Sequence, residues 1–351
     1  MNGGFLLPLL VGLALSTVAS GGARLLFHRL ALIDRPGTED HKHHAAAVPY
    51  GGGAAVLLAV LVAMGLALLR QPQLAQPTDR GPLWPIAGGA LALFCLGQVD
   101  DLRPLPARLK LLVQILIISA VVLLGGLQVD FLATRDWPVL ALSSAVLWCV
   151  LVTNAYNLLD HADGFSATTA LISAVVLLAA ALMAEDPVLA ALWAALIGAL
   201  GGFLIWNLPP ARLYLGDAGS LPLGFLLGAG ALSITFWPSS AERPVSPLAL
   251  TAPLLITAIP IYDTTVVMIK RLRRGRPVFR GDRSHIGHRL GRLGLSKRAG
   301  LACIAALQTA LAGSALLLRY SEPAIAGVIL AQAACVLIVV ILLEARRDHE
   351  S

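Results

Sequence analysis

The chain has 351 residues, of which 57% are hydrophobic and only 13% are charged, and its mean hydropathy is +0.79. Soluble domains average about 25% charged residues, so this composition excludes an ordinary water-soluble globule, a disordered chain and a disulfide-based scaffold. The 26 basic and 20 acidic residues give a net charge of +6. We expect a membrane protein with no nucleic-acid partner.

Long apolar blocks dominate the chain, and a helix that crosses a bilayer needs about 20 such residues. Eleven blocks qualify, at roughly 4–23, 50–69, 82–98, 109–126, 137–154, 165–184, 187–207, 219–237, 248–269, 299–319 and 323–343. They are apolar on every face, whereas barrel strands would alternate, so we predict an all-α polytopic protein with about 11 transmembrane helices. Because basic residues follow the first block rather than precede it, we expect a retained helix and not a signal peptide.

Basic residues are distributed unevenly between the two sets of loops that these spans define. The loops after odd-numbered spans, together with the C-terminal tail, hold 21 of the 26 Lys and Arg residues. Since basic loops stay in the cytoplasm, we predict an external N-terminus and a cytoplasmic C-terminus. All eight histidines and the acids that suggest chemistry fall on the same cytoplasmic side.

The segment 97–114 places adjacent carboxylates, Asp100 and Asp101, at the end of one span and Lys110 at the start of the next. Neighbouring carboxylates repel each other, so the pair favours a bound cation or a raised pKa. The alternative is a solvated loop in which the acids pair with nearby arginines.

The segment 154–165 contains Asn154 and Asn157 three residues apart, and Asp160 and Asp163 with the same spacing. In a helix this spacing puts each pair on one face. Amide and carboxylate oxygens suit a hard cation such as Mg²⁺, whereas the alternative is helix capping. Two Asn and two Asp within ten residues exceed what capping needs.

The segment 213–224 contains a single acid, Asp217, in a loop with glycines that let the backbone approach a ligand closely. Ser220 is suited to cap the next helix, whose first N–H groups would favour phosphate. Asp217 is therefore a natural metal ligand, and the alternative is a tight turn between helices.

The segment 260–298 is strongly basic, with eleven Lys and Arg and one acid, Asp282, after its apolar part ends. Such charge suits anionic lipid or a phosphorylated substrate, although a plain positive-inside loop explains most of it. Asp263 lies within the apolar part, where a carboxylate needs a partner. His285 and His288 have no nearby Cys or HExxH pattern, so we expect them to bind substrate rather than zinc.

The segment 34–53 carries Lys42 and His44 ahead of Pro49 and a run of glycines. Taken alone, this cluster is weak evidence, because an anchor beside the membrane would explain it. Its value lies in its position as the first of five hydrophilic segments on one face.

These five segments, in this order, resemble the polyprenyl-phosphate N-acetylhexosamine-1-phosphate transferases, a group within glycosyltransferase family 4 that begins bacterial cell-envelope glycan synthesis. The family patterns are K-x-H before Pro and two Gly, D-D followed by Lys and Gln, N-x-x-N-x-x-D-G-x-D-G, G-D-x-G-S, and P-x-x-D with a His-rich end. They fall here on Lys42, His44, Pro49 and Gly52–Gly53; on Asp100, Asp101, Lys110 and Gln114; on Asn154, Asn157, Asp160, Asp163 and Gly164; on Gly216, Asp217, Gly219 and Ser220; and on Pro260, Asp263, Asp282, His285 and His288. Five patterns in register imply one polytopic transferase domain over residues 1–351.

The chain departs from these patterns at three positions. His161 stands where the family usually has Gly, and Phe165 where it has Leu. Gly287 replaces the middle His of the common H-x-H-H ending. The departures lie near the region where the family binds nucleotide and sugar, so they bear on the sugar rather than on the reaction.

The resemblance implies attack by a lipid phosphate on the sugar-proximal phosphorus of a UDP-N-acetylhexosamine, with release of UMP. It assigns Asp217, with Asn157, to a Mg²⁺ ion for which Mn²⁺ could substitute. Asn154 and Asn157 would grip the diphosphate, and Asp100 or Asp101 would keep the lipid phosphate deprotonated or sit in the outer shell of the metal. Lys42 and Lys110 would offset phosphate charge, and the implied catalytic residues are Asp100, Asp101, Lys110 and Asp217. The remaining substrate contacts would come from His44, Asp160, Asp163, Asp263, Asp282, His285 and His288.

The implied partners are a UDP-N-acetylhexosamine, undecaprenyl phosphate and the bilayer of the bacterial inner membrane, with a homodimer left open. N-acetylglucosamine is favoured because the His285–His288 ending looks more like that branch. The runner-up is the phospho-N-acetylmuramoyl-pentapeptide transferase of peptidoglycan synthesis. A transporter is the alternative from another class of protein. Transporters place ionisable residues near the bilayer midplane and often repeat their halves, whereas here the acids lie in loops or at the ends of spans and none of the five motifs is duplicated.

Overall fold

The computed structural model of the chain describes residues 4–30, 33–34, 48–75, 83–125, 137–235, 248, 251–275, 285–318 and 321–348. Its elements are α1 (Leu6–Arg29), β1 (Ile33–Asp34), β2 (Val48–Pro49), α2 (Gly52–Arg70), the 3₁₀ turn η1 (Pro72–Ala75), α3 (Leu83–Leu102), α4 (Ala107–Gly125), α5 (Pro138–Leu159), α6 (Phe165–Met183), α7 (Pro187–Asn207), α8 (Asp217–Thr235), α9 (Ala252–Ile256), α10 (Ala258–Arg273), α11 (Ile286–Arg292), α12 (Lys297–Leu318) and α13 (Pro323–Asp348). Within these residues the strands form a single two-residue antiparallel pair, so the all-α prediction is confirmed.

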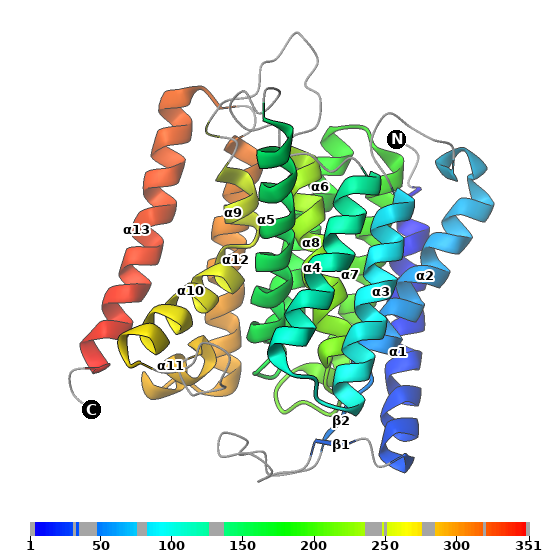
Figure 1. Cartoon of the computed structure of the whole chain (residues 1–351), viewed down its shortest axis with the longest axis horizontal. Helices are drawn as coiled ribbons and strands as arrows, with labels where there is room; N and C mark the ends of the chain where they lie inside the picture. The colour runs from blue at the N-terminus through cyan, green and yellow to red at the C-terminus, as the bar shows by residue number, and fades with distance from the viewer. Residues whose placement is uncertain are drawn as a thin grey trace.

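The long helices run side by side in one bundle (Figure 1). Helix α8 lies in its interior against α2, α3, α5 and α6, while α13 stands at the edge and packs on α12 and α11. The β1–β2 pair, α11 and the C-terminal end of α13 lie at one end of the bundle, and α1 begins near the other (Figure 1). The segments that carry polar motifs therefore gather at one end.

Helical segments occupy all eleven places where the sequence predicts a membrane span. Nine of them, α1 to α7 with α12 and α13, are long and apolar enough among the described residues to cross a membrane. Helix α8 and the α9–α10 pair occupy the other two places. The chain is therefore a multi-pass membrane protein, and its count of crossings and its orientation stay predictions.

The predicted span 248–269 differs from the structure because it is divided at Thr257 into α9 and α10. Pro260 has no N–H to donate to the Ile256 carbonyl one turn earlier. That carbonyl instead accepts hydrogen bonds from Ser173 Oγ at 2.6 Å and from Gln308 Nε2 at 2.7 Å. Gln308 Oε1 also accepts from the backbone N–H of Ile259 at 3.1 Å. Two neighbouring helices thus satisfy the backbone at the break.

Two glycines bring neighbouring helices into direct contact with the first turn of α8. A Cβ at Gly97 in α3 would lie 2.2 Å from the backbone oxygen of Asp217, and a Cβ at Gly53 in α2 would lie 2.3 Å from the Gly219 nitrogen. Only glycine permits this approach of one backbone to another. The start of α8, which carries Asp217, is consequently fixed between α2 and α3.

Candidate active site

The backbone start of α8 is capped by Asp101 from the end of α3. Asp101 Oδ1 accepts a hydrogen bond from the N–H of Asp217 at 2.8 Å, and its Oδ2 accepts from the N–H of Ala218 at 3.0 Å. Gly216, which precedes α8, has a positive φ of 74°, and a Cβ there would lie 2.6 Å from Asp101 Oδ2. A carboxylate at a helix N-terminus is stabilised by the unpaired N–H groups and the helix dipole. Asp101 thereby holds Asp217 in place.

Lys110, near the start of α4, lies between two carboxylates from different helices. Its Nζ is 3.1 Å from Asp100 Oδ2 and also contacts Asp217 Oδ2. Asp100 Oδ1 accepts from the backbone N–H of Leu105 at 2.7 Å, which closes the turn between α3 and α4. The adjacent acids Asp100 and Asp101 of segment 97–114 are thus linked to Asp217 of segment 213–224, Asp100 through Lys110 and Asp101 through the backbone.

Asn157, in the last turn of α5, contributes an amide to the same place. Its Nδ2 donates to Asp217 Oδ1 at 2.7 Å and to Ser220 Oγ at 2.9 Å. Asn154, one turn earlier, donates to Gln114 Oε1 at 2.7 Å and to the carbonyl of Val150 at 2.8 Å. Both residues lie on a helix, as their spacing predicts, but in the structure Asn157 reaches Asp217 and Asn154 bonds to α4.

Asp160 follows α5 and completes a cluster of acids. The pKa of Asp160 is well above its ordinary value, because the carboxyl group is buried and the carboxylates of Asp217 and Asp101 lie nearby, although the N–H of Gly216 hydrogen-bonds to it. We call Asp100, Asp101, Asp160 and Asp217, together with Lys110 and Asn157, the carboxylate centre. Even with Asp160 protonated, its other three acids outnumber its one lysine among the described residues, so the centre has an excess of negative charge that suits a divalent cation.

Asp163 takes a different position from the other predicted residues of its segment. Its Oδ2 accepts from the N–H of Ala211 and from Lys297 Nζ, both at 3.3 Å. Its carboxylate also contributes to the raised pKa of Asp160, after the larger effects of burial, Asp217 and Asp101. These contacts tie the α5–α6 turn to the turn before α8 and to the start of α12, so in the structure Asp163 positions loops.

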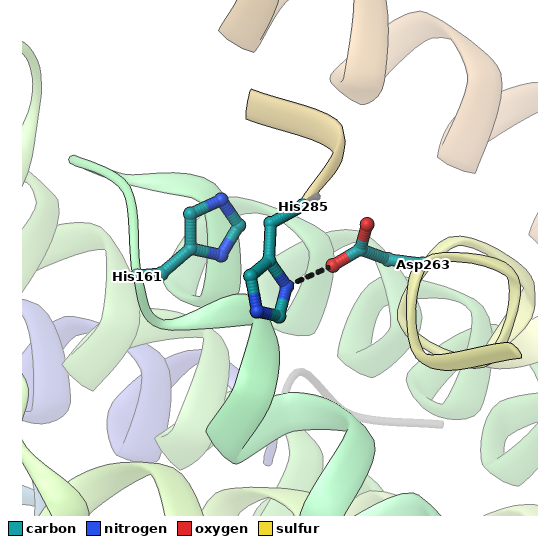
Figure 2. Close-up of side chains that lie close together, drawn as sticks. All are labelled: His161, Asp263 and His285. Carbon is teal, nitrogen blue, oxygen red and sulfur yellow. Dashed lines mark hydrogen bonds and ion pairs between the residues drawn. The ribbon is translucent and has the colours of Figure 1, made fainter. Parts of the chain in front are cut away.

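A second buried cluster surrounds Asp263 in α10. Asp263 Oδ2 is 2.9 Å from His285 Nδ1, and its Oδ1 accepts from the backbone N–H of Ile286 at 2.6 Å and from Arg289 Nη1 at 3.1 Å (Figure 2 draws the Asp263–His285 bond). A carboxylate cannot donate, so His285 carries its proton on Nδ1. The prediction that Asp263 needs a partner is confirmed by these contacts.

Sequence reasoning missed three members of this cluster: Tyr262, Arg289 and Glu344. Glu344 lies near the end of α13. Its Oε2 is 2.9 Å from Arg289 Nε and also accepts a hydrogen bond from the hydroxyl of Tyr262 at 2.9 Å. For Glu344, the sequence did offer a signal. Glu344 directly follows the apolar block 323–343, and a carboxylate at the end of a membrane span needs a partner. We call Tyr262, Asp263, His285, Arg289 and Glu344 the histidine network.

His161 lies beside the histidine network, on the turn after α5 (Figure 2). Its ring centroid is 4.4 Å from that of His285 and 5.8 Å from that of His288. Its Nδ1 donates to the carbonyl of Leu158 at 3.0 Å, since a carbonyl can only accept. Burial, assisted by the neighbouring His285, lowers the pKa of His161 to about 3, so the ring is neutral.

Ligand atoms of His161, Asp263 and His285 lie within 4.8 Å of one another, which is close enough to suggest a metal site. The contacts of Asp263 argue against it. Its two oxygens already bind a guanidinium, a backbone N–H and an imidazole N–H. The oxygens of Asp263 are therefore paired with donors of the protein itself, and we assign no metal to these residues.

Three predicted substrate residues lie outside the part of the chain that the structure describes: Lys42, His44 and Asp282. The remaining ones occupy the carboxylate centre, the histidine network or their immediate surroundings. Segments that are far apart in sequence thus converge on two adjacent sites, which Asp160 and His161 link because they are neighbours in the chain.

A bundle of apolar helices with buried carboxylates gathered at one end defines a polytopic membrane protein with a buried acidic site. The family model described as glycosyl transferase family 4 matches residues 83–235. The protein of Bacillus subtilis (strain 168) named "Probable undecaprenyl-phosphate N-acetylglucosaminyl 1-phosphate transferase" is 31% identical over 77% of this chain and 72% of its own length.

Two further relatives carry related names. The decaprenyl-phosphate N-acetylglucosaminephosphotransferase of Mycobacterium tuberculosis is 29% identical over 82% of this chain and 77% of its own. The undecaprenyl-phosphate alpha-N-acetylglucosaminyl 1-phosphate transferase of Escherichia coli (strain K12) is 25% identical over 86% and 80%. The chain belongs to glycosyl transferase family 4, and it is an enzyme rather than a transporter.

Proposed function

We propose that this protein transfers an N-acetylhexosamine-1-phosphate, most simply N-acetylglucosamine-1-phosphate, from a UDP-sugar to undecaprenyl phosphate. Three of its relatives are named for transfer of N-acetylglucosamine or its phosphate to a polyprenyl phosphate, which supports this acceptor and this sugar. The product is a lipid-diphosphate sugar, the first intermediate of an envelope glycan. We place the reaction on the cytoplasmic face of the bacterial inner membrane, where the predicted topology puts 21 of the 26 basic residues.

One observation carries the proposal: Asp217 meets Asn157 from α5 and Lys110 from α4, while Asp101 from α3 caps its backbone. Four separate helices position one carboxylate, and three further carboxylates lie around it. Such convergence costs free energy because like charges repel, and a bound cation would offset that cost. Capping alone would not bring these acids together.

The centre suits Mg²⁺, or Mn²⁺ in its place, because its donors are carboxylate and amide oxygens. Asp217 would be the main protein ligand. Rotation of the Asn157 carboxamide, whose Nδ2 now faces Asp217, would turn its oxygen toward the same ion. When bound, such an ion would neutralise the diphosphate of the sugar nucleotide and polarise its phosphorus–oxygen bonds.

In the proposed reaction, a phosphate oxygen of the lipid attacks the sugar-proximal phosphorus. The new phosphorus–oxygen bond forms as the bond to the UMP oxygen breaks, and UMP leaves with the electron pair. This chemistry depends mainly on position and charge neutralisation. A phosphate monoester has a second pKa near ~6, so the attacking group is already ionised at neutral pH and a strong base is not required.

The residues of the centre divide these tasks. Lys110 adds positive charge beside Asp217. Asn154 and Asn157 lie one turn apart on α5, and their amides would have to leave Gln114 and Asp217 to bind the diphosphate. Both oxygens of Asp101 are occupied by backbone N–H groups, so we assign it to positioning the first turn of α8. His285 of the histidine network, together with His288, would then contact the sugar nucleotide through the imidazoles.

The test uses washed membranes that contain the full chain, a panel of UDP-sugars, added undecaprenyl phosphate and Mg²⁺. We expect release of UMP with UDP-N-acetylglucosamine and a lipid-diphosphate sugar that mass spectrometry detects. EDTA should abolish both products, and excess Mg²⁺ or Mn²⁺ should restore them. UMP release that persists in EDTA would exclude the metal, and the absence of product with every UDP-sugar would overturn the proposal.

A further inference from the structure

The two unusual residues His161 and Gly287 come from different segments and lie against each other. Gly287 is in α11, between His285 and His288. A Cβ at Gly287 would lie 3.0 Å from His161 Nε2, 3.2 Å from the Ala162 Cβ and 3.2 Å from the Phe165 ring. The His161 side chain therefore fills space that a larger residue at position 287 would need.

Backbone conformation does not explain the glycine. Gly287 is not among the glycines with positive φ, and it lies inside a helix, where alanine is more favourable than glycine. The steric contacts with His161, Ala162 and Phe165 account for it instead, and the contact with His161 is the shortest of the three. The same contact explains why a histidine fits at position 161, because its ring uses the space that a side chain at position 287 would fill.

The His161 ring also orders its surroundings. Its Nδ1 is anchored to the Leu158 carbonyl, and its ring lies at 31° to that of His285 and at 28° to that of His288. His285 in turn holds Asp263. An imidazole at position 161 thus connects the turn that carries Asp160 to the first residues of α11.

We propose that His161 and Gly287 are an exchanged pair, in which the α5–α6 turn supplies the imidazole that the middle position of the His-rich segment lacks. Position 161 departs from the family pattern by a gain of histidine and position 287 by its loss, and the structure puts the two changes in contact. His161 is accordingly a positioning residue for His285 and His288. This role rests on the proposed function, because it concerns the sugar-nucleotide side of the site.

A cycle of variants tests the pair: His161→Gly, Gly287→His and the double variant, each assayed for kcat and for both KM values. We expect His161→Gly to raise the KM for the UDP-sugar about tenfold, the loss typical of a supporting residue, and to leave the KM for lipid phosphate unchanged. Gly287→His alone should lose activity because of the clash, and the double variant should recover to within about threefold of the unmodified chain. A double variant no better than the product of the two single effects would overturn the exchange, and equal shifts of both KM values would overturn the positioning role.

Gly287→Ala gives a milder readout if Gly287→His fails to fold. We expect this change to lower the thermal unfolding midpoint when His161 is present, and to lower it less when position 161 is glycine, because the contact with His161 is then absent while those with Ala162 and Phe165 remain. An equal decrease in both backgrounds would overturn the pairing. Because the midpoint requires no turnover, this measurement tests the pair even if the proposed transfer reaction is not observed.

Discussion

The carboxylate centre and the histidine network lie close together, but their buried acids differ in how many donors and cations of the protein they are paired with. In the histidine network, Arg289 pairs with both Asp263 and Glu344, and His285 and Tyr262 donate to the same two acids. The acids of this network are matched by donors of the protein itself. This pairing holds α10, α11 and α13 together, so that His285 is fixed in position on the sugar-nucleotide side of the proposed site.

The carboxylate centre lacks such a balance among the described residues. Lys110 serves both Asp100 and Asp217, and the pKa of Asp160 rises because burial is added to repulsion from the neighbouring acids. Perturbed carboxylates gathered at the end of a bundle are characteristic of functional sites. For this reason we assign the proposed cation to the carboxylate centre and not to the cluster that offers a histidine.

The largest expected effect is on catalysis, from Asp217→Asn. Removal of the carboxylate should lower kcat at least about 100-fold, because one preorganised electrostatic contact in an active site contributes that much or more. UMP release from membranes with equal amounts of inserted protein provides the measurement.

Asp186→Asn is the matched control. Asp186 caps α7 through Oδ1, which accepts from the N–H groups of Val188 and Leu189 at 3.0 Å, and asparagine also caps helices well. Activity should change less than twofold. Near-normal turnover of Asp217→Asn would contradict the metal assignment.

The histidine network should respond in stability instead. Asp263→Asn leaves Arg289 beside a neutral amide, and loss of one partner of a buried ion pair costs about 3 kcal/mol or more. We expect a lower thermal midpoint in detergent with no change in the affinity for divalent ions. A midpoint equal to that of the unmodified chain would show that the network does not stabilise the fold.

A smaller effect concerns pH and His161. Its pKa is lowered from 6.5 to about 3 in the folded state, so below pH 6.5 the unfolded chain binds a proton that the folded chain does not. Stability should therefore fall as the pH decreases from 6.5 toward 3, by up to about 1.4 kcal/mol per pH unit. Unfolding midpoints of the chain and of His161→Gln test this, because glutamine should make the dependence less steep. An unchanged slope would exclude His161 as its source.

The smallest effect is expected for Glu344→Gln. Glutamine keeps an oxygen for the Tyr262 hydroxyl, and Arg289 keeps its ion pair with Asp263, so the change should cost about 2 kcal/mol, less than Asp263→Asn. Thermal unfolding in detergent gives the value, with Asp263→Asn as the reference. If Glu344→Gln lowers the stability more than Asp263→Asn does, then Glu344 of α13, and not Asp263 of α10, contributes most to the network.

The sequence predicts much of the fold, because hydrophobic length alone locates helical segments. Every predicted span has its helix, and the error concerns the interruption at Thr257. Pro260 signals a weakened turn, but the compensation comes from Ser173 and Gln308 on other helices, and such long-range hydrogen bonds leave no local pattern.

The site is predictable to a similar degree. Spacing places Asn157 on a helix, and adjacency marks Asp100 and Asp101, so the polar members of the carboxylate centre can be read from the sequence. The sequence does not distinguish Asp160, which joins the centre, from Asp163, which bonds to Ala211 and Lys297. That difference depends on how the turn folds after α5.

The most direct test measures where a divalent ion binds, by electron paramagnetic resonance of Mn²⁺ added to the purified chain and to two variants. We predict that the chain binds a single Mn²⁺, that Asp217→Asn abolishes this binding, and that His285→Gln, which changes only the histidine network, retains it. Mn²⁺ that stays bound to Asp217→Asn but is lost from His285→Gln would contradict the assignment of the cation to the carboxylate centre.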